Sequence, residues 1–130
     1  MLDVIKTPAS RNTQQKQAIM AVFQACARPL SSQEILTLSQ ASVAQLGIAT
    51  VYRNLKSMVQ DGVLQTVSLP GEAPRYELAH LHHHHHFHCR LCDKVFDVHG
   101  CLKGVHELAP AGFIVESHDI TLYGACSECR

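Results

Sequence analysis

The stretch HHHHHFHCRLC, residues 82–92, divides this chain of 130 residues and indicates what lies on either side of it. Five consecutive imidazoles run almost directly into Cys89 and Cys92, and a second C-x-x-C pair follows at Cys126 and Cys129. Such a concentration of imidazoles and thiols is costly to bury unless something binds it. The pattern predicts bound metal, and more than one ion.

An expression tag or a set of disulfides would fit these residues less well than bound metal does. An expression tag lies at a terminus behind a linker, whereas this tract is internal and continues into the alternating segment Phe87-His88-Cys89. Disulfides among the six cysteines would require an oxidising compartment, but the N-terminus is too short and mixed for a signal peptide and no 18-residue apolar run exists. We therefore expect a cytoplasmic protein with no membrane segment.

The two C-x-x-C pairs predict one structural zinc site. A single pair could be a redox motif, but two pairs 34 residues apart fit a tetrahedral site in which every thiolate is deprotonated by the ion that all four share. The predicted ligands of this structural Zn²⁺ are Cys89, Cys92, Cys126 and Cys129.

Charge is unevenly distributed although the net charge is zero. Residues 1–78 carry seven Lys/Arg against five Asp/Glu, which gives +2, and residues 79–130 carry four against six, which gives −2. Any nucleic acid would therefore meet the first half. An excess this small predicts modest, salt-sensitive non-specific affinity.

The first half of the chain predicts three helices and two strands. Apolar residues recur at helical spacing over 13–26, and Ser31-Ser32-Gln33-Glu34 is a capping box that opens a second helix. A third helix is expected over 48–60, ended by Gly62. Short strands at 63–67 and 75–78 then flank a loop rich in Pro and Gly.

The third helix has two different faces. Its apolar residues cluster on one side, whereas Ala49, Arg53 and Lys56 lie on the other, with Tyr52 on the flank. A solvated surface helix would show the same pattern. The two preceding helices and the two following strands favour a winged helix-turn-helix whose third helix lies in the DNA major groove.

Several motifs in this order resemble the Fur (ferric uptake regulator) family. They are GIATVYRNL at 47–55, RYEL at 75–78, the histidine tract, Cys89-x-x-Cys92 and LYGACSEC at 122–129. The resemblance covers about residues 11–129. It implies an α+β protein with a winged-helix DNA-binding domain at 1–78, a hinge at 79–83 and a small metal-binding α/β dimerisation domain at 84–130.

The resemblance also places the third helix in the DNA groove. Tyr52 would contact a thymine methyl group, and Arg53 would bind a base edge or a phosphate. The full set of expected DNA-binding residues is Arg11, Lys16, Ala49, Thr50, Tyr52, Arg53 and Lys56.

In the second half, strands are expected at 84–89 and 94–98, a short helix at 101–108, and a long strand or hairpin partner at 113–123. Strand alternation places His84, His86 and His88 on one face, and His83, His85 and Phe87 on the other. One tract can thus supply ligands to two sites.

The resemblance implies a regulatory metal site between the two halves. The matching residues are Glu77, His84, His86 and Asp97. The family usually adds a histidine just before the second helix, where this chain has Arg28-Pro29-Leu30. Four ligands suit tetrahedral zinc better than a six-coordinate Fe²⁺ or Mn²⁺ site.

A second metal-binding group would use the other strand face. His83 and His85 would face His118, which comes from the expected last strand. In many members of the family the position of His85 is an aspartate. The usual glutamate partner is absent, because the chain is about three residues shorter here, so Cys101 or Gly104 stands in its place. Ligation by Cys101 would favour zinc. The alternative is that Cys101 is a small buried core residue. Cys26 is expected to be a core residue.

These features predict a metal-activated repressor of metal-uptake genes. Zinc is the expected signal, as in the family's Zur branch, and the expected partners are a second copy of the chain and palindromic, A/T-rich double-stranded DNA. The alternatives are an iron, manganese or peroxide sensor of the same family, or a metal-buffering protein. A zinc hydrolase or deaminase would need H-x-E with P-C-x-x-C, which the sequence lacks, so no enzyme is expected.

Overall fold

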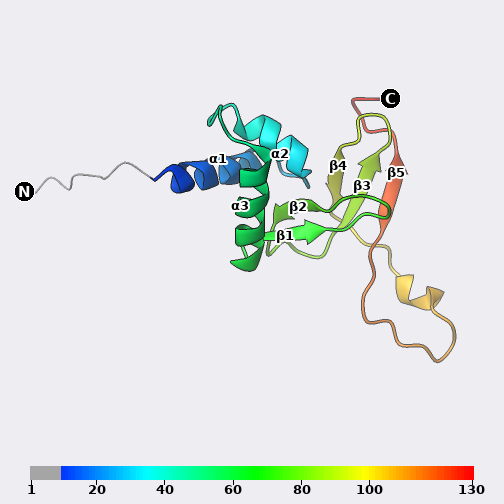
Figure 1. The fold of residues 1–130 in the computed structure, drawn as a ribbon. Helices are drawn as coiled ribbons and strands as arrows, with labels where there is room; N and C mark the ends of the chain where they lie inside the picture. The colour runs from blue at the N-terminus through cyan, green and yellow to red at the C-terminus, as the bar shows by residue number, and fades with distance from the viewer. Residues whose placement is uncertain (1–9) are drawn as a thin grey trace, which may run out of the picture.

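The computed structural model describes residues 10–130, so the start of the predicted DNA-binding domain lies outside the described residues. Three helices, α1 (Arg11–Ala25), α2 (Ser32–Ser39) and α3 (Ile48–Gln60), precede an antiparallel pair, β1 (Leu64–Val67) and β2 (Arg75–Leu78). A second sheet has the order β4 (Val95–Val98), β3 (His85–Cys89), β5 (Thr121–Gly124), with a 3-10 turn, η1 (Val105–Leu108), in the connection (Figure 1). This is the expected α+β architecture of a winged helix-turn-helix followed by a small α/β unit.

Local sequence signals set the ends of α2 and α3. Ser31 accepts a hydrogen bond from the backbone of Glu34, whose carboxylate accepts from the backbone of Ser31, so the predicted capping box is present. At the end of α3, Gly62 has φ +76° and its N–H donates to the carbonyl of Val59, while the N–H of Val63 donates to Met58. This left-handed cap turns the chain directly into β1.

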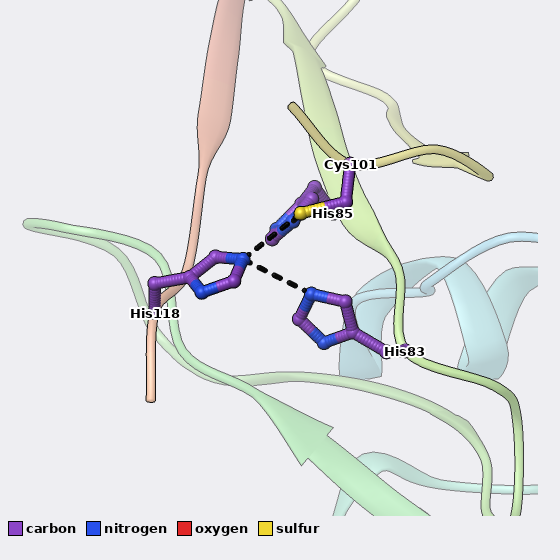
Figure 2. A group of neighbouring side chains, drawn as sticks. All are labelled: His83, His85, Cys101 and His118. Atoms are coloured by element: carbon purple, nitrogen blue, oxygen red, sulfur yellow. Dashed lines mark hydrogen bonds between the residues drawn. The ribbon is translucent and has the colours of Figure 1, made fainter. Parts of the chain in front are cut away.

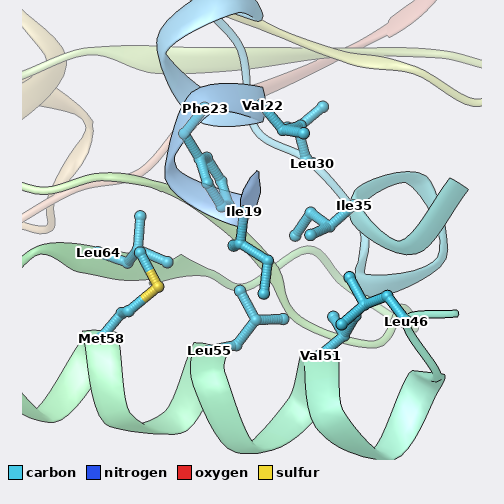
Figure 3. Close-up of a cluster of buried hydrophobic side chains, with 10 residues drawn as sticks. All are labelled: Ile19, Val22, Phe23, Leu30, Ile35, Leu46, Val51, Leu55, Met58 and Leu64. Carbon is cyan, nitrogen blue, oxygen red and sulfur yellow. The ribbon is translucent and has the colours of Figure 1, made fainter. Parts of the chain in front are cut away.

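The three helices share one hydrophobic core with the base of the wing (Figure 3). Val51, Leu55 and Met58 bring the apolar face of α3 into it, and each is fully buried. Burying one such side chain stabilises the fold by about 1.5–3 kcal/mol. The remaining members are Ile19, Val22, Phe23, Leu30, Ile35, Leu46 and Leu64. Because Leu64 belongs to β1, the wing and α3 form one packed unit.

The C-terminal part differs from the sequence-based expectation in two elements. The strand expected over 113–123 forms only at Thr121–Gly124, and it pairs parallel to β3 instead of forming a hairpin. A parallel pair needs a long crossover, which residues 99–120 supply. The helix expected over 101–108 is reduced to η1, because Gly104 turns the chain with φ +83° just before it.

Within residues 10–130, no helix has both the length and the apolar composition that a membrane span requires.

Candidate metal centres and nucleic-acid interface

Glu77, His84, His86 and Asp97 come together between the wing and the second sheet, with their ligand atoms within 4.8 Å of one another. His86 and Asp97 are paired neighbours on β3 and β4, whereas Glu77 arrives from β2. The His84 Nε2 atom lies 3.0 Å from Glu77 and 3.4 Å from Asp97, and His86 Nε2 lies 3.5 Å from both carboxylates. Ligands about 2.0–2.1 Å from a tetrahedral ion are about 3.3–3.5 Å apart, so the group fits zinc.

The hydrogen bonds around this group also fit a cation. The Nδ1–H of His84 donates to the carbonyl of His82 at 2.7 Å, which leaves Nε2 as the atom that faces the carboxylates. Within the described residues, His86 Nε2 and Asp97 Oδ1 are buried without a hydrogen-bond partner. A buried polar atom left unpaired is destabilising, and a bound cation would satisfy both.

Charge interactions perturb the same residues strongly. Burial alone would raise the pKa of Glu77, but its contacts with His86, Gln65 and His84 lower that pKa to about 2. Burial and the neighbouring charge of Glu77 raise the pKa of Asp97. Burial would lower the pKa of His84, yet the His82 carbonyl and the two carboxylates raise it overall. Positive charge is therefore favoured at the centre of the group.

His83, His85, Cys101 and His118 form a second group on the other face of β3 (Figure 2). His118 Nε2 lies 3.1 Å from His83 Nε2 and 3.0 Å from Cys101 Sγ, and Cys101 Sγ lies 3.3 Å from His85 Nε2. Of Cys101 and Gly104, the two residues that could stand in the place of the usual glutamate, the structure thus brings Cys101 into the group. Cys101 is exposed, which excludes the alternative of a core residue.

One contact makes His85 the weakest fit for a metal in this second group. The backbone N–H of Ile120 donates to His85 Nδ1 at 3.1 Å, so a neutral ring carries its proton on Nε2, the atom that faces Cys101. Ligation through Nε2 requires that proton to move. Burial and the charges of His83 and His118 lower the pKa of His85, which favours the neutral ring.

The four predicted zinc ligands are adjacent, at the tips of two loops. Cys89 and Cys92 turn the chain from β3 to β4, and Cys126 and Cys129 follow β5. The Cys92 and Cys126 sulfurs are 3.8 Å apart, the separation of about 3.8 Å expected for zinc–sulfur bonds of about 2.3 Å and far beyond a disulfide.

The backbone and the neighbouring thiols set the acidity of this group. Backbone N–H donors from Cys92 and Cys126, set against burial, lower the pKa of Cys89 to about 6. Contacts with Cys126 and Cys92 raise the pKa of Cys129 to about 12. The thiol of Cys89 thus ionises the more readily of the two, whereas a bound zinc ion would displace the proton of Cys129.

Helix α3 presents the face expected to meet DNA. Tyr52 is 52% exposed, and its hydroxyl lies 3.2 Å from Ser32 Oγ. The guanidinium of Arg53 donates to Thr50 Oγ1 at 3.1 Å, while Ala49, Arg53 and Lys56 are exposed. Lys16 lies 3.6 Å from Asp61, and Arg11 is exposed at the start of α1. The helix contains no acidic residue, so its outer surface is available to phosphates.

A polar network that sequence reasoning missed connects the wing to the loop of Cys92. The buried guanidinium of Arg75 lies 3.1 Å from Asp93, 3.5 Å from Glu34 and 3.7 Å from Glu72. His88 Nε2 is 2.6 Å from Asp93, so it points to this network and not to the group around Glu77. Asp93 has φ +65°, an uncommon conformation for a residue other than glycine, and no short-range pattern in the sequence indicates it. The single positive charge of Arg75 is shared among three carboxylates, of which Glu34 is also paired with Arg28. The network thus links the wing to the loop of Cys92, and Glu72, His88 and Asp93 form a further group of potential metal ligands within it.

Comparison with known proteins identifies the family. Residues 8–123 match the model of the Ferric uptake regulator family. The chain is 33% identical over 123 residues to the zinc uptake regulation protein of Mycobacterium tuberculosis, covering 92% of this chain and 95% of that protein. It is 29% identical over 132 residues to the peroxide operon regulator of Bacillus subtilis, covering 98% of this chain and 90% of that protein.

A solved structure of a zinc uptake regulator complexed with zinc and DNA is also similar, with a TM-score of 0.56 and 25% identity over 91% of this chain and 82% of that one. The matching family model spans both the helical part and the second sheet. The chain belongs to the ferric uptake regulator family, and it is a metal-responsive transcription regulator, not an enzyme.

Proposed function

We propose that this protein is a zinc-responsive repressor of metal-uptake genes that acts in the cytoplasm. The observation that carries the proposal is the group Glu77, His84, His86 and Asp97, because it links β2 of the wing to β3 and β4. A divalent ion bound there would neutralise two carboxylates and hold both parts of the chain at one angle. We place the hinge at 79–83, between domains at 1–78 and 84–130; His80, with φ +65°, lies in it.

The residues of this group transmit the signal to DNA. Glu77 is only 3% exposed, and Gln65 of β1 donates to its carboxylate at 2.8 Å, so its position depends on both wing strands. The wing in turn packs with α3 through Leu64 and Met58. A change in the position of Glu77 relative to His86 is therefore a change in the orientation of the DNA-binding helix.

The ligand chemistry favours zinc over the other metals of the family. Four ligands at tetrahedral separations suit zinc, and the thiol of Cys101 in the second group does so as well. The similarity to the zinc uptake regulation protein of Mycobacterium tuberculosis agrees with this choice. The similarity to the Bacillus subtilis peroxide operon regulator keeps a peroxide sensor of the same family as the alternative. A titration with zinc, iron and manganese distinguishes a zinc sensor from a sensor of another metal.

We further propose that α3 reads a palindromic, A/T-rich operator, with the structure of a related zinc uptake regulator bound to DNA as support. Arg53→Ala should weaken operator binding by about 5- to 150-fold, because a good base contact is worth about 1–3 kcal/mol. Fluorescence anisotropy of a labelled operator at fixed salt, with and without added zinc, measures this loss.

The matched control for that measurement is Lys103→Ala, which removes one exposed positive charge from the C-terminal part. Its operator affinity should stay within about twofold of the unchanged protein, since surface charge far from the helix adds little. Equal losses of operator affinity in the two variants would show that α3 contributes only non-specific positive charge. Equal affinity with zinc, with iron, with manganese and with no added metal would exclude metal gating.

The crossover 99–120 supports a homodimer. It extends away from the sheet in Figure 1. It contains four large apolar residues whose exposed fractions are 71% for Leu102, 84% for Leu108, 70% for Phe113 and 90% for Ile114. Four large apolar side chains exposed on one connecting segment support an interaction surface here. Sedimentation velocity in zinc should therefore give twice the chain mass of 14.3 kDa.

The double variant Phe113→Gln/Ile114→Gln should shift this species to the monomer. Leu38→Gln, which changes an exposed leucine of α2, should leave it dimeric. A dimer that survives the double variant would place the interface elsewhere.

A further inference from the structure

A cavity adjoins the regulatory group. It has a volume of about 180 Å³ and lies between the end of α1 and the strand β4. Glu77 and Asp97 line it together with Cys26 and His99. Neither Cys26 nor His99 belongs to the four-residue group, so this cavity offers two further metal-binding side chains at its edge.

His99 is the better placed of the two. It follows Asp97 by two residues, immediately after β4, and both side chains line this cavity. Its ring centre lies 6.1 Å from that of His84, compared with 4.9 Å between His84 and His86. Two imidazoles bound to one ion through bonds of about 2.1 Å have ring centres about 4.5–6.4 Å apart. The separation of His84 and His99 lies within this range.

The surroundings of His99 permit its side chain to rotate. Its side chain is exposed, and among residues 10–130 it makes no hydrogen bond or ion pair. The segment between α1 and α2, residues 26–31, contains no histidine and so supplies no competing imidazole. Cys26 is half-buried at the end of α1 and packs against the hydrophobic core, which restricts its movement.

We propose that His99 is a fifth ligand of the regulatory metal. This inference rests on the proposed regulatory site and extends it. A set of three imidazoles and two carboxylates gives the ion a higher coordination number than the four-residue group alone, so His99 determines how well the site accepts metals other than zinc. Because Cys101 of the second group follows two residues later, His99 also connects the two metal groups through Gly100.

Cobalt(II) alone is a suitable probe, because its visible absorption reports coordination number and thiolate ligation. The protein should carry zinc at the four-cysteine site and Cys101→Ser/His118→Ala to disable the second group. Without further change, bound cobalt should show the weak absorption of a five- or six-coordinate ion. His99→Ala should convert it to the intense absorption of a four-coordinate ion and weaken cobalt affinity about tenfold or more.

His99→Cys gives a gain of signal: a thiolate-to-cobalt charge-transfer band should appear that the parent protein lacks. His80→Asn, at an equally exposed histidine with positive φ, should change neither spectrum nor affinity. Identical spectra and affinities for the parent and His99→Ala would overturn the role of His99 while leaving the regulatory site intact. A charge-transfer band in the parent that Cys26→Ser removes would assign the fifth position to Cys26 instead. Absence of any cobalt binding in the parent would refute the regulatory site itself.

Discussion

Cys89→Ser should release the structural zinc and unfold the C-terminal sheet, the largest loss of stability expected from a single substitution in this chain. Structural zinc contributes an apparent free energy of about 10–16 kcal/mol in small zinc domains, which is comparable to the whole stability of a typical domain. The three strands of this sheet are four or five residues long, and its buried residue Val95 packs with Val67 and Leu69 from the wing side. Little apolar burial would remain to hold the sheet once the ion is lost.

Zinc content measured by elemental analysis and resistance to limited proteolysis would report this change. The expected outcome is the loss of one zinc per chain and rapid cleavage within residues 84–130, while the helical part stays folded. Removal of zinc by a strong chelator should have the same effect. Cys26→Ser is the matched control, since Cys26 lies outside the group of four thiols. Retention of that zinc by Cys89→Ser would refute the structural site.

Glu77→Gln should abolish the stimulation of DNA binding by zinc without unfolding the protein. The substitution keeps the shape of the side chain and an acceptor for the hydrogen bond from Gln65, but it removes the charge nearest to His84. Allosteric coupling of about 1–3 kcal/mol corresponds to a stimulation of about 5- to 150-fold, and this factor should fall close to one. Operator affinity of the variant should match that of the unchanged protein without zinc.

The measurement is an operator titration with and without zinc, together with zinc content after dialysis. One zinc per chain should be lost relative to the unchanged protein, while the ion held by four thiolates remains. His83→Ala, in the second group, controls for the general loss of a metal-binding side chain and should retain most of the stimulation. Full stimulation in Glu77→Gln would show that the regulatory ion binds elsewhere.

Local sequence patterns were sufficient to predict much of the structure of the helical part. The capping box at Ser31 and the left-handed cap at Gly62 depend on residues within a few positions of each other, and both form as predicted. The apolar face of α3 is also a property of a single element. For the same reason, alternation along β3 correctly separated the side chains of His84 and His86 from those of His83 and His85.

Local patterns failed where the outcome depended on distant partners. Nothing within 113–123 indicates that only Thr121–Gly124 will pair, or that β3 will be its parallel neighbour. Alternation placed His88 with His84, but Asp93 binds it at the far end of the strand. A strand exposes its hydrogen-bonding groups along its whole length, and the connection and packing around it select which of them are used.

The sequence by itself determined the family, the α+β architecture and which side chains could bind metal, because composition and short-range spacing carry that information. Only the tertiary structure decided which of these side chains meet. It brought Glu77 from the wing to His86 and Asp97. It placed Cys101, and not Gly104, in the second metal-binding group. It also placed His99 in the cavity that Glu77 and Asp97 line. The physical reason is that periodicity orders residues within one element, whereas contacts between elements arise from packing and from the reach of the connecting chain.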